Sequence, residues 1–259
     1  MNTLKLIARQ IRYTNKAFWR NPASAFFTFA FPLMFLVIFT TLLGNGHVQG
    51  LDVKQSTLYV PAMAAFGVIT ACYTNLAINI SIQRDEGILK RLRGTPLPPW
   101  AFMVARVLHA MFVALVLVVI CTAFGVLVYG AHLPSGAWLL RYVITFIVGG
   151  AAFAALGLAL TGVIPNADAS PAIVNASILP LLFLSDVFIQ FGTNVPAWVD
   201  FVGKVFPVRH FVEAMKSAYL QKPSIPTFAF HWSDLVVVAI WGVAGVIVAA
   251  RTMSWEPRR

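Results

Sequence analysis

Long apolar segments separated by shorter polar ones dominate the hydropathy pattern of this chain. Six of them approach or exceed the roughly 20 apolar residues that a helix needs to cross the hydrocarbon core of a bilayer. They are residues 23–43, 57–80, 102–129, 139–164, 169–191 and 235–250. The pattern predicts an all-α integral membrane protein with six transmembrane helices, arranged as a single domain over residues 1–259.

The first 20 residues predict a helix of another kind. At 100° per residue, four basic side chains fall on one side, and apolar side chains cluster nearly opposite them. The basic set is Lys5, Arg9, Arg12 and Lys16. We expect a basic amphipathic helix that lies in the headgroup plane of the membrane and contacts lipid. A positively charged flank that only sets topology is the alternative.

A long polar interruption, residues 192–231, separates the fifth and sixth apolar segments. Connections of this length without structure of their own are uncommon. Within it, PAWVDFVGKVFP and VRHFVEAMKSAYL both show helical spacing of apolar residues. We therefore expect short helices, divided by Pro207, that lie on the outer leaflet or re-enter it.

Composition and charge agree with a membrane protein. The chain is 59% hydrophobic and 11% charged, whereas a soluble domain has about 45–50% and 25%. Thirteen of the 19 Lys and Arg residues fall on the inner side if the N-terminus is inside, and the short outer loops hold only Lys54 and Arg141. This asymmetry predicts a multi-pass protein with both termini in the cytoplasm. It also explains the net charge of +10 without nucleic acid.

Polar residues inside the spans are candidates for the wall of a conduit. Asn75 and Asn79 share one face of the second span, which Gln83 continues, and Asn175 and Asp186 share a face of the predicted fifth helix. Polar faces within a bilayer must meet another helix or a wet cavity. Hydrogen bonds that only hold helices together are an equal alternative.

Motifs of catalysis are missing from the sequence. It contains no G-x-x-x-x-G-K-[ST] phosphate loop, so the chain has no usual means of holding ATP, and neither H-E-x-x-H nor G-x-S-x-G occurs. His210 and Glu213 lie one helical turn apart without a third ligand nearby. We therefore predict neither an enzyme nor a metal site.

The densest run of charge, RDEGILKRLRGTPLPP, covers residues 84–99 between the second and third spans. Glu86 and Lys90 have the i, i+4 spacing that supports a short helix, and Leu89 and Leu92 give it an apolar side. A loop that only fixed topology would need neither feature. A short helix with an apolar side, held between two spans, is suited to docking a cytoplasmic partner.

This run resembles the coupling-helix segment of bacterial ABC-2-type transporter permeases, where Glu-x-Gly precedes a leucine-bearing turn and Thr/Ser-Pro. FWRNPASAFFTFAFPLMFLVIF resembles the first span of the drug-export branch, of the daunorubicin and multidrug-resistance type. IPNADASPAIVNASILPLLFLSDVFI and PAWVDFVGKVFPVRHFVEAMK resemble the fifth span and the outer re-entrant region. The likeness covers essentially the whole chain. It assigns ATPase coupling to Glu86, Gly87, Leu89, Lys90, Leu92, Thr95 and Pro96.

The resemblance implies the membrane subunit of an ATP-driven exporter in the bacterial inner membrane. Two such subunits, either two copies of this chain or this chain with a paralogue, would pair with two copies of a separate ABC ATPase. Glu86, Leu89 and Leu92 would enter a groove of that ATPase, which would bind ATP and magnesium, while this chain would hold no cofactor. The substrates would be amphipathic small molecules such as drugs, polyketides or lipids, moved outward. An ion-coupled secondary transporter without an ATPase is the alternative.

Overall fold

Helices form every regular element of the structure in the residues that it describes. The structure is a computed structural model, and it describes residues 3–42, 44–46, 54–95, 97–188, 196–220 and 232–256. The prediction of an all-α membrane protein is confirmed at the level of fold class.

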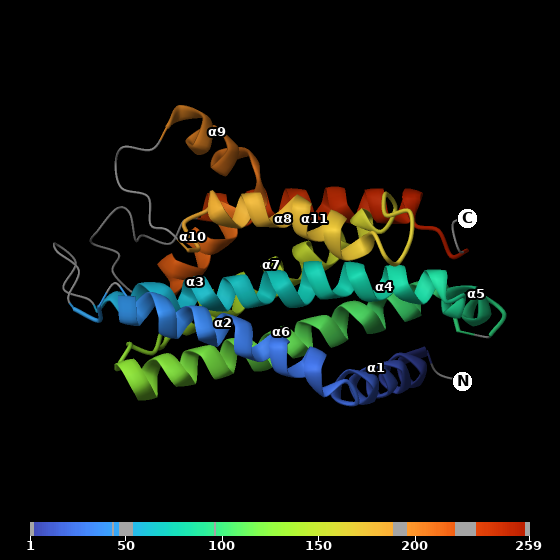
Figure 1. Cartoon of the computed structure of the whole chain (residues 1–259), viewed down its shortest axis with the longest axis horizontal. Coiled ribbons are helices and arrows are strands. Elements are labelled where there is room, and N and C mark those ends of the chain that lie inside the picture. Colours follow the sequence, from blue (N-terminus) through green and yellow to red (C-terminus); the bar gives the residue numbers. More distant parts are fainter. Residues whose placement is uncertain are drawn as a thin grey trace.

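In the described part of the chain, five helical runs are long and apolar enough to cross a membrane. They are α2 (Pro22–Leu42), the continuous run of α3, η1 and α4 (Gln55–Asp85), α6 (Pro99–Tyr129), α7 (Ala137–Leu160) and α11 (Trp232–Thr252). They follow the long axis of the molecule (Figure 1). With 31 residues, α6 is about 46 Å long, which matches a bilayer with its headgroup regions.

The fifth predicted span is shorter than expected. α8 (Ser170–Phe183) has 14 residues, or about 21 Å, which falls short of the roughly 30 Å hydrocarbon core. Turns and bends follow it up to residue 188, and residues 189–191 lie outside the described part of the chain. Asp186 lies in these turns with a φ of 56°. It therefore does not share a helical face with Asn175, and that prediction is wrong.

The second span changes its hydrogen-bonding pattern halfway. α3 (Gln55–Ile69) passes into a π-helical segment, η1 (Thr70–Asn75), and then into α4 (Leu76–Asp85). π-helical turns inside α-helices are rare and often mark functional positions. α7 approaches this segment closely at Gly157, where an added Cβ would lie 2.8 Å from the carbonyl oxygen of Tyr73.

A second close approach joins α7 to α11. An added Cβ on Gly242 would lie 2.8 Å from the Cβ of Ala152, and one on Gly245 would lie 2.9 Å from the backbone nitrogen of Leu156. Small residues let membrane helices approach along their backbones, where van der Waals packing replaces the missing hydrophobic driving force.

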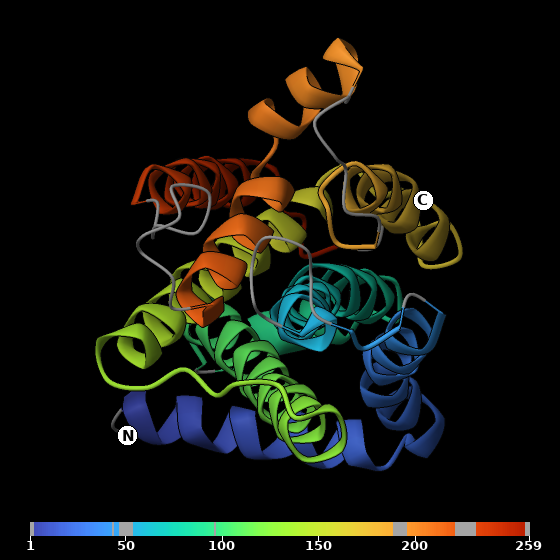
Figure 2. The same cartoon turned by 90° about the vertical axis from the view of Figure 1, so that its left-hand side faces the viewer.

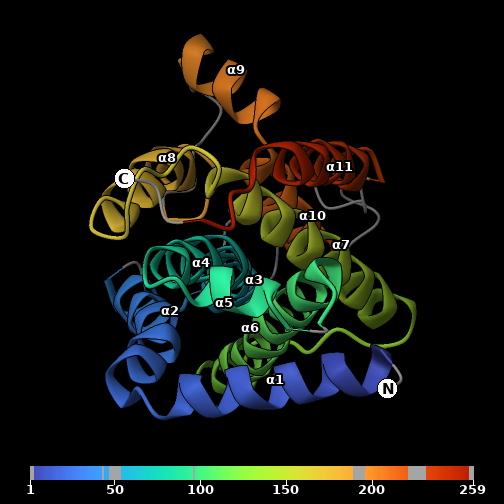
Figure 3. The same cartoon turned by 90° about the vertical axis from the view of Figure 1, so that its right-hand side faces the viewer.

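The predicted amphipathic helix is present as α1 (Thr3–Trp19), which lies across one end of the bundle (Figures 2 and 3). Ile7 is buried, and the helix packs on α6. Asn21 then caps α2, because its Oδ1 accepts a hydrogen bond from the backbone N–H of Ser24 at 3.2 Å. The four predicted basic residues of α1 are all exposed: Lys5, Arg9, Arg12 and Lys16.

Two helices occupy the interruption before the last span. α9 (Ala197–Val205) and α10 (Pro207–Leu220) meet at Phe206, as the proline predicted. α10 is packed between α3, α7 and α11, whereas α9 projects from the bundle (Figure 1). Residues 192–195 and 221–231 of this segment lie outside the described residues.

Candidate functional site

The predicted coupling segment forms a short helix, α5 (Ile88–Arg93), at the end of the molecule that also carries α1 (Figures 1 and 3). α4 ends at Asp85, and Gly87 opens α5 with a φ of 70°, a conformation that glycine adopts without strain. Glu86 therefore lies outside α5. Among the ion pairs of the described residues none joins Glu86 to Lys90, so the predicted pair within one helix is not formed.

The leucine side chains of α5 pack against the hydrophobic core of this chain. Leu89 has no exposed surface and belongs to the hydrophobic core, and Leu92 is half-buried against that core. The expectation that Leu89 enters a groove of a partner is therefore wrong. Pro96 lies outside the described residues. The other predicted coupling residues expose their side chains: Glu86, Lys90 and Thr95.

Arg84, two residues before the break at Glu86, is the largest fully buried side chain among the described residues, with 1% of its surface exposed. Its Nη1 donates a hydrogen bond to the carbonyl oxygen of Thr161 at 3.0 Å. Its Nη2 donates to the carbonyl oxygens of Ile164 at 2.9 Å and Pro165 at 3.2 Å. One guanidinium thus satisfies three carbonyl groups that follow the end of α7.

Asp85 completes this connection. Its Oδ1 accepts a hydrogen bond from Nε of Arg84 at 3.2 Å, and its Oδ2 accepts one from the backbone N–H of Ala167. Together the two side chains fasten the end of α4 to the turn that leads into α8. The sequence marked Arg84 only as an inner positive charge, because nothing in its local pattern indicates a partner 77 residues away.

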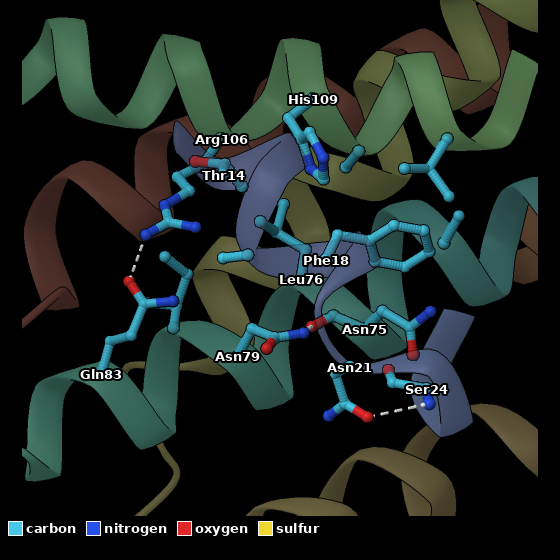
Figure 4. Close-up of a pocket in the computed structure, with 15 residues that line it drawn as sticks. Thr14, Phe18, Asn21, Ser24, Asn75, Leu76, Asn79, Gln83, Arg106 and His109 are labelled. Atoms are coloured by element: carbon cyan, nitrogen blue, oxygen red, sulfur yellow. Dashed lines mark hydrogen bonds between the residues drawn. The ribbon is translucent and has the colours of Figure 1, made fainter. Parts of the chain in front are cut away.

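A polar cavity of about 170 Å³ lies between α1, α2, the second span and α6 (Figure 4). Asn75, Asn79 and Gln83 line it from the second span, and Arg106 and His109 line it from α6. The polar face of the second span therefore borders a cavity. Its role as a conduit stays a prediction.

Hydrogen bonds join the elements around this cavity. Nη2 of Arg106 donates to Oε1 of Gln83, which links α6 to α4. Nδ2 of Asn75 donates to Oγ1 of Thr28 at 3.3 Å, which links η1 to α2, and Nδ2 of Asn79 donates to the carbonyl oxygen of Asn75 at 2.7 Å. The amides thus both shape the cavity and hold the helices around it.

Asn175 and Asp186 do not line this cavity. Asn175 is half-buried on α8. The backbone oxygen of Asp186 accepts a hydrogen bond from Nζ of Lys216 at 2.7 Å, and its Oδ2 lies 3.9 Å from Nε of Arg209. The four predicted conduit residues therefore fall into separate regions of the molecule.

Arg106 and His109 were not predicted as cavity residues. Arg106 is one of the 13 basic residues on the predicted inner side, and it also falls inside the predicted span 102–129. A charged residue within an apolar span usually marks a functional position, because burying it in lipid is costly. The position of Arg106 inside an apolar span was therefore the sequence feature that could have identified it as a candidate functional residue.

A second, apolar cavity of about 350 Å³ lies between α7, α8, α10 and α11. Two hydroxyl groups in its lining, those of Tyr73 and Ser177, form a hydrogen bond with their oxygens 2.8 Å apart. η1 thus places Tyr73 at the apolar cavity and Asn75 at the polar one. The π-helical segment lies between both cavities.

A further set of hydrogen-bonded polar groups lies at the end of the molecule that carries α9. His210 donates from Nδ1 to Oδ1 of Asp234 at 2.8 Å and from Nε2 to the carbonyl oxygen of Lys204 at 2.9 Å. Both ring nitrogens face acceptors, so the protonated imidazole fits best. The hydrogen bond to Asp234 raises the pKa of His210 above its ordinary value of 6.5, although burial opposes this.

Comparison with known proteins places this geometry in a family. Residues 5–220 match the model of the ABC-2 type transporter family. The chain is 24% identical over 208 residues to "Probable multidrug ABC transporter permease YbhR" of Escherichia coli strain K12, which covers 80% of this chain and 55% of that protein. YbhR of Escherichia coli O157:H7 matches to the same extent.

A third relative has a length closer to that of this chain. "Putative transport permease YvfS" of Bacillus subtilis strain 168 is 21% identical over 208 residues, covering 80% of this chain and 83% of that protein. The chain spans about half the length of the YbhR proteins that it matches. Because the family match covers residues 5–220, which include α5 and every residue that lines the polar cavity, the chain belongs to the ABC-2 type transporter family.

Proposed function

We propose that this chain is the permease subunit of an ATP-driven ABC exporter that moves amphipathic small molecules from the cytoplasm or inner leaflet outward. A separate ABC ATPase supplies the energy. Family membership and the names of the YbhR relatives support a permease. The coupling role rests on the structure around α5, a short helix with an exposed polar surface. Arg84, which precedes this helix, is hydrogen-bonded to the carbonyl oxygen of Thr161 at the end of α7.

The fastening gives α5 a way to transmit movement. The Leu89 side chain of α5 is buried in the hydrophobic core. A force on the exposed Glu86 and Lys90 would therefore be transmitted to the helix bundle and would not only bend a loop. Arg84 and Asp85 carry the same force to the turn before α8. Closure of a docked ATPase pair would therefore displace α4 and α8 together.

The two cavities suit an amphipathic substrate. The apolar one has a volume of about 350 Å³, which lies within the usual range of about 300–1,000 Å³ for small-molecule sites. The polar one offers amide, guanidinium and imidazole groups. η1 borders both, and a π-helical segment is a place where a helix can change its register. Movement of the second span at η1 would thus alter both cavities.

The assembly that we propose contains two permease subunits, identical or paralogous, and two ATPase copies in the bacterial inner membrane. α1 and α5 lie at one end of the molecule (Figure 1), as expected if that end faces the cytoplasm. α9 and the C-terminal end of α2 lie toward the other end, which would face outward.

Coexpression tests this proposal directly. A tagged permease is purified after coexpression with a candidate ABC ATPase subunit, and the complex is reconstituted in vesicles with a fluorescent amphipathic dye. We expect copurification and dye transport that requires ATP. Transport that survives ATP depletion and collapses with an uncoupler would instead support the ion-coupled alternative.

A further inference from the structure

We propose that the polar cavity beneath α1 binds an anionic oxygen group, a phosphate or a carboxylate, that forms the head of an amphipathic molecule at the inner leaflet. Arg106 is its main ligand and His109 its second. This deepens the proposed function, because it states the chemistry that the permease recognises, and it rests on that function only where the bound molecule is also transported.

The first observation is the half-buried charge of Arg106, which makes no ion pair among the described residues. Nε of Arg106 is buried and has no hydrogen-bond partner, and Nη2 is bound to the neutral amide of Gln83. The guanidinium carbon lies 4.9 Å from the centre of the Phe102 ring, which compensates only part of the charge. No Asp or Glu lies among the residues that line the cavity. A charge partly removed from water is stabilised by a partner, and an anion in the cavity would supply one.

The second observation is the set of donors that remain. His109 is 7% exposed, and its Nε2 is buried without a partner. His109 and Arg106 lie one helical turn apart on α6 and border the same cavity (Figure 4). The amides of Asn75 and Asn79 already donate elsewhere. Among the residues that line the cavity, the buried side-chain nitrogens without a partner are Nε of Arg106 and Nε2 of His109. A guanidinium matches the two oxygens of a phosphate or carboxylate.

Size and depth indicate a headgroup rather than a whole ligand. A cavity of about 170 Å³ is smaller than the roughly 300 Å³ at which drug-sized sites begin. Arg106 lies seven residues after the start of α6 at Pro99, or about 10 Å along a helix that matches the full bilayer. That depth is close to the boundary between headgroups and hydrocarbon. A tail would therefore extend into the bilayer while the head enters the cavity.

Surface charge at the same end agrees with an anionic ligand. α1 covers the cavity with Thr14 and Phe18 and exposes its basic residues on another side. Basic amphipathic helices concentrate anionic lipids and amphiphiles at a membrane surface. Such molecules would be enriched next to the cavity before they enter it.

Binding by the purified full-length chain, without any ATPase, tests the site. The chain is held in dodecyl maltoside micelles and titrated with dihexanoyl phosphatidic acid, with dihexanoylglycerol, which lacks the phosphate, or with inorganic phosphate. We expect phosphatidic acid to bind and to raise the thermal unfolding midpoint, and dihexanoylglycerol to do neither. Binding of inorganic phosphate as well would show that the anionic group alone suffices. Equal binding of both lipids would overturn the proposal.

Matched variants assign the site to Arg106. We expect Arg106→Gln to weaken the binding of phosphatidic acid at least tenfold and Arg251→Gln, an exposed arginine on the last span, to leave it unchanged. Gln83→Ala, which keeps the guanidinium and removes its neutral partner, should retain binding. If Arg106→Gln does not fold, Arg106→Lys takes its place, with weaker but measurable binding expected. Unchanged affinity in either Arg106 variant would sink the proposal.

Measurements on the complex with the ATPase then distinguish a transported anionic molecule from a resident membrane lipid. Phosphatidic acid that binds and also stimulates ATP turnover is a model of the transported molecule. Binding without stimulation identifies a resident membrane lipid, and both results support the site. Loss of binding in the isolated chain, with ATP-driven transport intact, would refute the anion site and leave the permease assignment standing.

Discussion

The guanidinium of Arg84 donates a 3.0 Å hydrogen bond to the carbonyl oxygen of Thr161, across 77 residues of sequence. This bond joins the end of the second span to the end of α7, immediately before α5 begins. Any element that pushes on α5 therefore acts on a buried hydrogen-bonded connection. Four predictions follow from this connection and from the packing and charge around it.

Replacing Arg84 by alanine should destabilise the protein strongly. The change leaves three carbonyl groups and Asp85 without their buried partner, and breaking such a buried pair costs about 3–5 kcal/mol. Thermal unfolding followed by size exclusion in detergent measures the loss. Arg93→Ala, which removes an exposed arginine of α5, is the control and should have little effect. Equal effects of the two variants would show that the buried connection does not matter.

Leu89 and Glu86 should separate stability from coupling. Leu89→Ala removes a fully buried side chain and should lower stability by about 2–5 kcal/mol. Glu86→Ala removes an exposed carboxylate, so the unfolding midpoint should stay the same while ATP turnover and transport by the complex decrease. Unchanged coupling in Glu86→Ala would argue against docking through this residue.

A side chain at Gly157 should disrupt the contact between α7 and η1. Its Cβ would lie 2.8 Å from the carbonyl oxygen of Tyr73, a backbone atom that cannot rotate away. We expect Gly157→Val to cost about 1–3 kcal/mol or more, as overpacking does. Gly46→Val is the control, because no atom lies within 4 Å of a Cβ there. The two unfolding midpoints should differ clearly, and similar values would contradict the close approach.

Stability should fall as the pH rises through the titration of His210. The bond to Asp234 raises the pKa of His210 above 6.5, so the folded state binds a proton more tightly than the unfolded chain. Its stabilisation is complete below about pH 6.5 and is lost as the pH passes the raised value. Thermal midpoints measured from about pH 6 to 9 should decrease for the native chain. Asp234→Asn should show a flatter profile, and an identical slope would exclude this pair as the cause.

Much of the fold could be predicted from the sequence. Apolar segments long enough to span a bilayer have no other stable structure than a helix, so five of the six predicted spans coincide with helices of sufficient length. The two faces of α1 follow from spacing at 100° per residue. The division of the outer segment into α9 and α10 follows from Pro207, because the residue before a proline avoids the helical region.

The candidate site could be predicted only in part. Asn75 and Asn79 were found because residues four apart share a helix face. Arg106 does not stand out in the sequence as a cavity residue, because a basic residue near a membrane surface usually marks topology. Leu89 was assigned to a partner because spacing shows that a helix has an apolar side but does not show what covers that side.

The sequence by itself determined that the surroundings of this protein are lipid and which segments of the chain form helices. A run of about 20 apolar residues must form a helix in lipid, because its backbone polar groups find no other partner there. The tertiary structure alone decided which buried groups meet. The contact of Arg84 with Thr161 and the absence of an acid beside Arg106 depend on helices far apart in the chain, and pairing between such residues leaves no periodic trace in the sequence.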